Sequence, residues 1–80
     1  QDLNVAGRHP DADIFLDDVT VSRKHVKIMR RDGEFFLEDL GSMNGTYVDG
    51  ARVDSAELST GSELMIGKFH LTFYASKKEA

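Results

Sequence analysis

The sequence predicts an all-β fold, a two-sheet antiparallel β-sandwich whose binding loops converge at one end. Apolar residues do not recur at helical spacing over any long stretch, whereas period-two alternation and turn signals recur throughout the 80 residues. Two Asp-Gly pairs, Asp32-Gly33 and Asp49-Gly50, supply the positive φ angles that tight hairpin turns need. Many short strands joined by such turns indicate a sandwich, in which loops at one end can form a site.

The expected strands follow one another in chain order. They cover residues 3–8, 14–16, 25–30, 35–37, 46–48, 52–53, 63–66 and 69–74. Val26 and Ile28 face the core, while Lys27 and Met29 face away from it. Residues 9–13, 17–23 and 40–44 have loop chemistry, and the polar stretch 54–61 is expected to be irregular. The last hairpin supplies the core candidates Leu64, Ile66, Phe69, Leu71 and Phe73.

The charge balance excludes some classes of partner. Ten Lys and Arg residues against fourteen Asp and Glu residues give a net charge of −4, which disfavours binding to nucleic acid or to an anionic membrane. Half of the cations nevertheless lie between positions 22 and 31: Arg23, Lys24, Lys27, Arg30 and Arg31. A local positive patch on an acidic chain suits a small, defined anion.

Composition also limits the cellular compartment and the cofactors that we expect for this protein. The chain has no cysteine, no Cys and His pair at zinc spacing, and no apolar run long enough to span a bilayer. Its first four residues lack the basic and apolar regions of a signal peptide. We therefore expect a cytoplasmic protein that binds no metal and no cofactor.

The stretch Ser22-Arg23-Lys24-His25 concentrates a hydroxyl, a guanidinium, an ammonium and an imidazole in four consecutive residues. Arg offers a planar fork of donors that matches phosphate, Lys offers a point charge, and Ser offers a small rotatable donor. Together they can cover the oxygens of a phosphoryl group. The expected ligand is therefore a phosphate attached to a larger molecule.

Four motifs together resemble the signature of the forkhead-associated (FHA) domain. They are Gly7-Arg8, Ser22-Arg23-Lys24-His25, Asn44-Gly45-Thr46 and the segment Gly61-Ser62-Glu63-Leu64-Met65-Ile66-Gly67. The resemblance implies a module that binds phosphothreonine peptides and recruits partners phosphorylated by a Ser/Thr protein kinase. The runs 7–22 and 67–69 are similar to those of small bacterial FHA regulators of central metabolism that inhibit 2-oxoglutarate dehydrogenase.

The resemblance also implies a role for each binding residue. Arg8 matches the arginine that pairs with the phosphate, Ser22 matches the serine that reaches its oxygens, and Arg23 resembles a second basic contact. Asn44 matches the asparagine that holds the peptide backbone, and Met43 is a wall of the site or a reader of later peptide residues. Without the other motifs, Arg8 would be an ordinary surface residue and Ser22 and Asn44 ordinary turn residues.

Four further residues are implied to support the site. His25 matches a histidine that braces the binding loops from within. Gly45 and Thr46 shape and anchor the loop that carries Asn44, and Gly7 lets the backbone turn Arg8 toward the pocket.

Other chemistries fit the sequence less well. Ser22, His25 and Asp39 supply the residue types of a hydrolase triad, but no nucleophile elbow surrounds the serine, so we expect no enzyme. The acidic residues between 11 and 18 lack the glycine and terminal glutamate of an EF-hand, and 41–46 lacks the ending of a nucleotide P-loop. Two functions remain open, a phosphothreonine-dependent adaptor and a phosphate-independent inhibitor of metabolic enzymes controlled by phosphorylation of an N-terminal tail outside this chain.

The expected domain covers residues 1–75, and residues 76–80 form a charged C-terminal tail. The resemblance starts late in the family pattern, so we expect an abbreviated sandwich that lacks its first strand. A missing strand leaves the N–H and C=O groups of its neighbour unpaired, which invites another chain to supply a strand. Self-association by strand exchange is therefore expected at high concentration.

Overall fold

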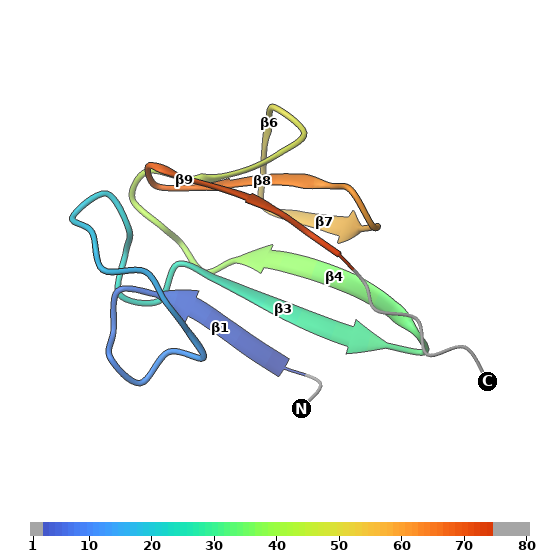
Figure 1. Ribbon diagram of the computed structural model, residues 1–80, viewed down its shortest axis with the longest axis horizontal. Helices are drawn as coiled ribbons and strands as arrows, with labels where there is room; N and C mark the ends of the chain where they lie inside the picture. The colour runs from blue at the N-terminus through green and yellow to red at the C-terminus, as the bar shows by residue number, and fades with distance from the viewer. Residues whose placement is uncertain (1–2, 75–80) are drawn as a thin grey trace.

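The computed structural model describes residues 3–74, which form nine strands and no helix. The strands are β1 (Leu3–Gly7), β2 (Ile14–Phe15), β3 (Val26–Arg31), β4 (Glu34–Asp39), β5 (Thr46–Val48), β6 (Ala51–Val53), β7 (Ser55–Leu58), β8 (Glu63–Ile66) and β9 (Phe69–Thr72). One sheet has the order β2-β1-β3-β4-β7 and the other the order β6-β5-β8-β9. Figure 1 shows them as two facing layers, which confirms the predicted all-β sandwich. Within residues 3–74, no helix is available that could cross a membrane.

Strand pairing is antiparallel except between β1 and β2, which run parallel. Both Asp-Gly turns form as predicted. Asp32 and Gly33 have φ values of 54° and 81° between β3 and β4, and Asp49 and Gly50 have values of 52° and 87° between β5 and β6. Two consecutive positive φ angles define the primed turn that matches the twist of a hairpin.

The expectation of an irregular stretch at 54–61 is wrong for part of it. Ser55–Leu58 forms β7, which pairs antiparallel with β4 and extends the five-stranded sheet. Its four residues alternate polar and apolar, and Leu58 is buried in the core. None of them is a strong strand former, so the open edge of β4 and the burial of Leu58 decide the conformation.

The core fills the space between the sheets. Its buried apolar residues are Ala6, Leu16, Val21, Val26, Leu37, Val48, Leu58, Leu64 and Ile66. Phe69, Leu71 and Phe73 pack partly buried against them, as expected for the last hairpin. Leu16 and Val21 come from the long connection between β2 and β3, so this loop is anchored in the core by two side chains.

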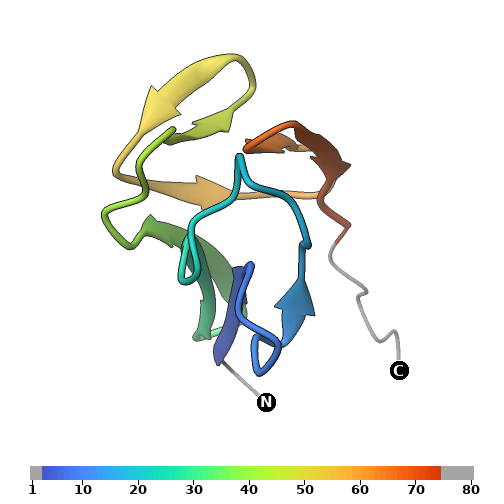
Figure 2. The same ribbon diagram turned by 90° about the vertical axis from the view of Figure 1, so that its left-hand side faces the viewer.

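Several connections gather at one end of the sandwich. They follow β1, precede β3, join β4 to β5, and join β8 to β9. Figure 1 shows this end on the left, and Figure 2 turns it toward the viewer. The predicted binding residues lie on these connections, at positions 8, 22–23 and 43–44.

Candidate functional site

The short segment 20–22 is the backbone to which two predicted binding side chains attach. The Nε–H of Arg8 donates to the carbonyl of Val21 at 2.9 Å. The Nδ2–H of Asn44 donates to the carbonyl of Thr20 at 2.8 Å. Arg8 directly follows β1 and Asn44 lies in the loop after β4, so two distant parts of the chain meet on adjacent residues of a third.

Ser22 joins the same segment to Met43 and to His25. Its hydroxyl oxygen accepts the backbone N–H of Met43 at 3.0 Å, and its own N–H donates to Nδ1 of His25 at 3.0 Å. The Nε2 of His25 lies 2.9 Å from the carbonyl of Gly45. Because Nδ1 accepts and a carbonyl cannot donate, His25 is the tautomer with its proton on Nε2. This fully buried ring ties the Ser22 loop to the Asn44 loop.

Gly45 and Gly7 are both required, for different reasons. Gly45 has a φ of 84°, and a Cβ there would lie 2.7 Å from Nε of Arg52. Gly7, in contrast, does not adopt a positive φ. A Cβ on Gly7 would instead lie 2.0 Å from the carbonyl oxygen of Arg23, which shows that β1 passes directly against the backbone of the Ser22 motif.

Asp39 organises the loop after β4. Its Oδ2 accepts the N–H groups of Gly41 and Ser42 at 2.9 Å, and its Oδ1 accepts the hydroxyls of Ser42 and Thr46 at 2.6 Å. Burial opposes ionisation of this carboxyl, but the hydrogen bonds from Ser42 and Thr46 outweigh it and lower the pKa of Asp39 below 3.8. The ionised side chain therefore holds the loop from one side while His25 holds it from the other.

Arg23 and Lys24 lie beside this arrangement. Both side chains are exposed and line a shallow hollow of about 300 Å³ together with His9, Asp11 and Asp13. Within residues 3–74, neither cation forms an ion pair. The structure therefore brings Arg8, Ser22, Met43 and Asn44 together on one backbone segment and places Arg23 at its side.

A second polar cluster at this end was not predicted. Asp18 accepts the N–H and the hydroxyl of Thr20, at 2.9 and 2.5 Å, and its other oxygen lies 3.1 Å from Nζ of Lys68. The hydrogen bond from the Thr20 side chain, then the one from its backbone and the interaction with Lys68, lower the pKa of Asp18 to about 2. Thr20 and Lys68 are 48 positions apart, so only the loop chemistry of Thr20 gave a signal in the sequence.

The hydrolase triad does not assemble. Both ring nitrogens of His25 are engaged by backbone groups of Ser22 and Gly45, and the Asp39 carboxylate contacts Ser42 and Thr46 instead of the ring. In the described part of the chain, no group of three or more acidic, His or Cys side chains lies close enough together to hold a metal ion.

Fold and site together define a small β-sandwich that presents polar and cationic loop side chains at one end. The FHA domain family matches residues 4–67, and the chain belongs to this family. The chain is also similar to an FHA domain solved in a structural and functional analysis of phosphothreonine-dependent interactions. The TM-score is 0.92 at 32% identity, and the match covers 98% of this chain and 81% of that one.

Its relatives include bacterial regulators. It is 56% identical over 78 residues to the glycogen accumulation regulator GarA of Mycolicibacterium smegmatis, covering 98% of this chain and 49% of the relative. It is 52% identical over 80 residues to the oxoglutarate dehydrogenase inhibitor of Corynebacterium jeikeium, covering 100% and 56% respectively. The chain thus spans about half the length of these relatives. The predicted resemblance to small bacterial FHA regulators is confirmed.

Proposed function

We propose that this domain binds phosphothreonine peptides through Arg8, Ser22 and Asn44 and thereby recruits partners phosphorylated by a Ser/Thr protein kinase in the cytoplasm. The observation that carries the proposal is that hydrogen bonds bring these residues together at segment 20–22. Arg8 and Asn44 each use one hydrogen bond to attach to this segment, Ser22 belongs to it and accepts the N–H of Met43, and their remaining donors and acceptors serve the ligand.

The remaining capacity matches a phosphate and an adjoining backbone. Arg8 uses only Nε–H within residues 3–74, so both Nη groups remain as a fork of donors. The oxygen of Ser22 is occupied as an acceptor, which leaves its proton for a phosphate oxygen. Asn44 uses one N–H and keeps its Oδ1 and second N–H, the pair needed to accept from and donate to a peptide backbone.

The energetics suit a reversible adaptor. A phosphothreonine carries a charge of about −1.5 to −2 at neutral pH, and hydrogen bonds to charged groups contribute about 1.5–3 kcal/mol each. Three such bonds contribute about 4.5–9 kcal/mol before the cost of ordering the peptide, against about 8 kcal/mol for a micromolar complex, so contacts with the flanking peptide must supply the rest. Arg23 and Lys24, exposed at the side, add attraction for the anion and for acidic flanking residues.

A second function is favoured by two apolar side chains at the same end. Val19 and Met43 are each 87% exposed, and they lie next to Thr20 and Asn44, whose hydrogen bond joins the two loops. Exposed apolar groups beside a polar site suit a protein surface larger than a peptide. Relatives named as oxoglutarate dehydrogenase inhibitor and as GarA make a metabolic enzyme the second candidate partner, bound without phosphate.

Fluorescence-anisotropy titration with matched peptides carrying phosphothreonine, phosphoserine or unmodified threonine tests the first function. We expect saturable binding of the phosphothreonine peptides alone. Arg8→Ala should weaken it at least about 100-fold, because two hydrogen bonds to the phosphate disappear. Arg31→Ala, which removes the same charge at the hairpin between β3 and β4, is the control and should bind like the wild type.

Thermal unfolding distinguishes a residue that contacts the ligand from a residue that supports the fold. Arg8→Ala should leave thermal unfolding nearly unchanged, whereas His25→Ala should lower both binding and stability, because a fully buried ring and two hydrogen bonds are lost. Equal loss of stability in the two variants would show that Arg8 is mainly structural. A folded wild type that binds none of the peptides would refute the first function and leave enzyme inhibition to be measured.

A further inference from the structure

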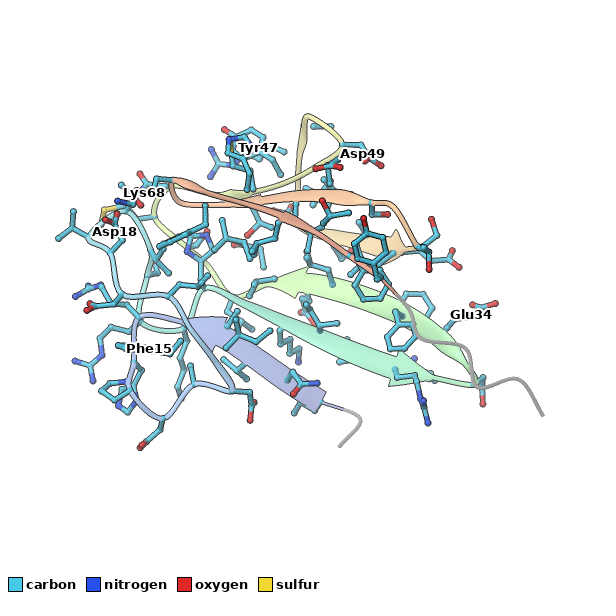
Figure 3. The ribbon with its side chains drawn as sticks, viewed as in Figure 1. Phe15, Asp18, Glu34, Tyr47, Asp49 and Lys68 are labelled. Carbon is cyan, nitrogen blue, oxygen red and sulfur yellow. The ribbon has the colours of Figure 1, made fainter. Side chains whose placement is uncertain are left out.

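We propose that Asp18, Thr20 and Lys68 form a positioning cluster that orients the Asn44 amide, and so sets the affinity for a phosphopeptide through the backbone of Thr20. The inference rests on the proposed function for its effect on affinity. The cluster lies at the binding end, where Figure 3 shows Asp18 and Lys68 close together and far from Glu34 at the opposite end.

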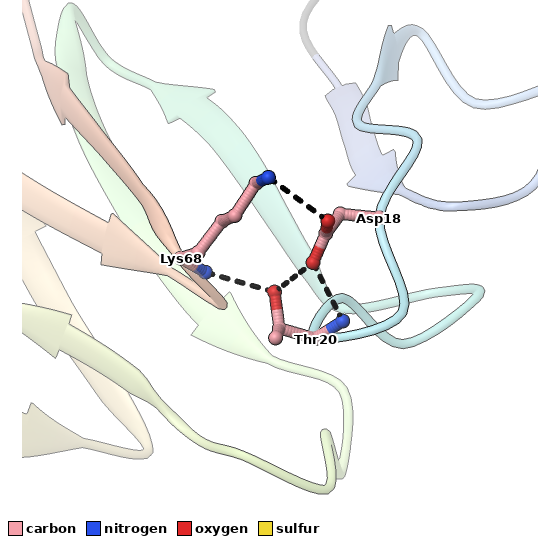
Figure 4. Close-up of polar contacts among 3 residues, drawn as sticks. All are labelled: Asp18, Thr20 and Lys68. Carbon is pink, nitrogen blue, oxygen red and sulfur yellow. Dashed lines mark hydrogen bonds and ion pairs between the residues drawn. The ribbon is translucent and has the colours of Figure 1, made fainter.

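The side chains of Asp18 and Thr20 and both the backbone N–H and the ammonium of Lys68 form a closed set of polar contacts (Figure 4). The Thr20 hydroxyl donates to Oδ2 of Asp18 at 2.5 Å and accepts the backbone N–H of Lys68 at 2.9 Å. The Lys68 ammonium closes the ring by pairing with Oδ1 of Asp18 at 3.1 Å. A hydroxyl that donates and accepts at the same time has a fixed rotamer, so the Thr20 side chain is held by both partners.

Close packing fixes the backbone of Thr20 as well. Gly67 precedes Lys68 in the turn between β8 and β9, and a Cβ on Gly67 would lie 2.6 Å from the Thr20 hydroxyl oxygen and 2.8 Å from the Thr20 carbonyl oxygen. The turn of the four-stranded sheet therefore lies directly against the loop before β3 of the other sheet. Any change that moves this turn moves the Thr20 carbonyl.

That carbonyl is the acceptor for Asn44. Within residues 3–74, the bond from Nδ2 of Asn44 to the Thr20 carbonyl is the single hydrogen bond of the Asn44 side chain. The orientation of the amide therefore depends on where Thr20 lies. A displaced carbonyl would turn the groups of Asn44 that the proposed function assigns to the peptide backbone.

The main rival is simple electrostatic attraction, in which the exposed Lys68 draws in an anion. The two readings predict opposite effects for Asp18→Asn. Removing a negative charge beside the site should tighten binding of an anionic peptide if attraction dominates. It should weaken binding if Asp18 acts by holding Thr20 and Lys68.

The test compares Thr20→Val, which keeps the shape and the carbonyl but removes the hydroxyl, with Asp18→Asn and Lys68→Met. We expect each to weaken phosphothreonine peptide binding about five- to tenfold, the effect of one misplaced hydrogen bond. Lys27→Met is the matched control, because Lys27 forms a comparable ion pair with Glu38, at 3.4 Å, on the outer face of the five-stranded sheet. It should leave affinity unchanged.

A second readout does not depend on a ligand. In ¹⁵N NMR spectra of the free protein, the side-chain amide signals of Asn44 should shift in Thr20→Val and Asp18→Asn and stay in place in Lys27→Met. Tighter binding by Asp18→Asn, or unchanged affinity and amide signals in Thr20→Val, would overturn the inference. If the wild type binds no phosphopeptide, the proposed function fails, and the Asn44 signals alone decide whether the cluster positions this side chain.

Discussion

Replacing Asp39 by asparagine tests whether one ionised carboxylate holds the loop 40–45. Its two oxygens accept four hydrogen bonds, two from the backbone of Gly41 and Ser42 and two from the hydroxyls of Ser42 and Thr46. Asparagine has the same shape but only one oxygen. If that oxygen faces the hydroxyls, the NH₂ group meets two backbone N–H groups. If the side chain is reversed, two hydroxyl protons lose their acceptor.

The reversed arrangement is costly because Thr46 is 0% exposed and water cannot replace the lost acceptor. In either orientation about two hydrogen bonds to a charged group are lost, at about 1.5–2 kcal/mol each, so Asp39→Asn should destabilise the fold by about 3 kcal/mol. A domain of this size has roughly 4–12 kcal/mol of stability in total. The midpoint of thermal unfolding should fall by roughly 12–24 °C.

The stability lost in Asp39→Asn should depend on pH. The folded-state pKa of Asp39 is depressed, so its contribution to stability is present above the unfolded value, 3.8, and disappears as the pH falls through the lower folded value. Thermal unfolding followed by circular dichroism should therefore show the largest gap between wild type and Asp39→Asn at neutral pH, and a smaller gap well below 3.8. The variant has no carboxyl here to titrate.

Glu38→Gln is the control, because Glu38 lies next to Asp39 on β4 but faces outward and pairs with Lys27. Losing an exposed pair should cost less than about 1 kcal/mol. The reasoning is refuted if Asp39→Asn unfolds within a few degrees of the wild type, or if the gap keeps one size from neutral to acid pH.

Two further predictions concern packing and edges. Gly7→Ala should cost at least about 2 kcal/mol in urea unfolding and abolish phosphopeptide binding, since its Cβ would meet the Arg23 carbonyl oxygen at 2.0 Å. A smaller loss than in Gly50→Ala, where a Cβ meets no atom within 4 Å and the only strain comes from a φ of 87°, would contradict this. The edge strand β9 borders an apolar groove lined in part by Ile14 and Leu71, so sedimentation velocity should show self-association at high concentration, and a strict monomer throughout would disprove it.

Much of the fold could be predicted from the sequence because its signals are local. Asp32-Gly33 and Asp49-Gly50 fix two hairpins by backbone preference alone, and the alternation around Val26 fixes which face of β3 is buried. The strand β7 was missed because Ser55–Leu58 has little strand preference of its own and pairs with β4 residues that lie 17 to 23 positions earlier, from Glu38↔Ser55 (55 − 38 = 17) to Phe35↔Leu58 (58 − 35 = 23). Its conformation is set by tertiary context.

The residues of the candidate site also divide into those that local sequence motifs predict and those that they do not. Arg8, Ser22 and Asn44 could be named because their motifs are local in sequence. The roles of Asp39 and Lys68 could not, since the sequence offered Asp39 only as a member of a hydrolase triad and Lys68 only as part of the run 67–69. The role of Lys68 arises from contact across the fold, since it lies 48 residues from Thr20, whereas Asp39 acts within its own loop, on Ser42 and Thr46.

Hydrogen bonds, more than apolar packing, hold the loops at the end of the sandwich that carries the proposed site. Its loops carry few apolar anchors, yet in the described part of the chain no buried side-chain nitrogen or oxygen is without a hydrogen-bond partner. His25, Asp39 and Thr20 accept hydrogen bonds from the loop N–H groups of Ser22, Ser42 and Lys68, and so hold the side chains of the proposed site in place without a ligand. Substitutions at these three positions should change affinity and local order together, whereas Arg8 should change affinity alone.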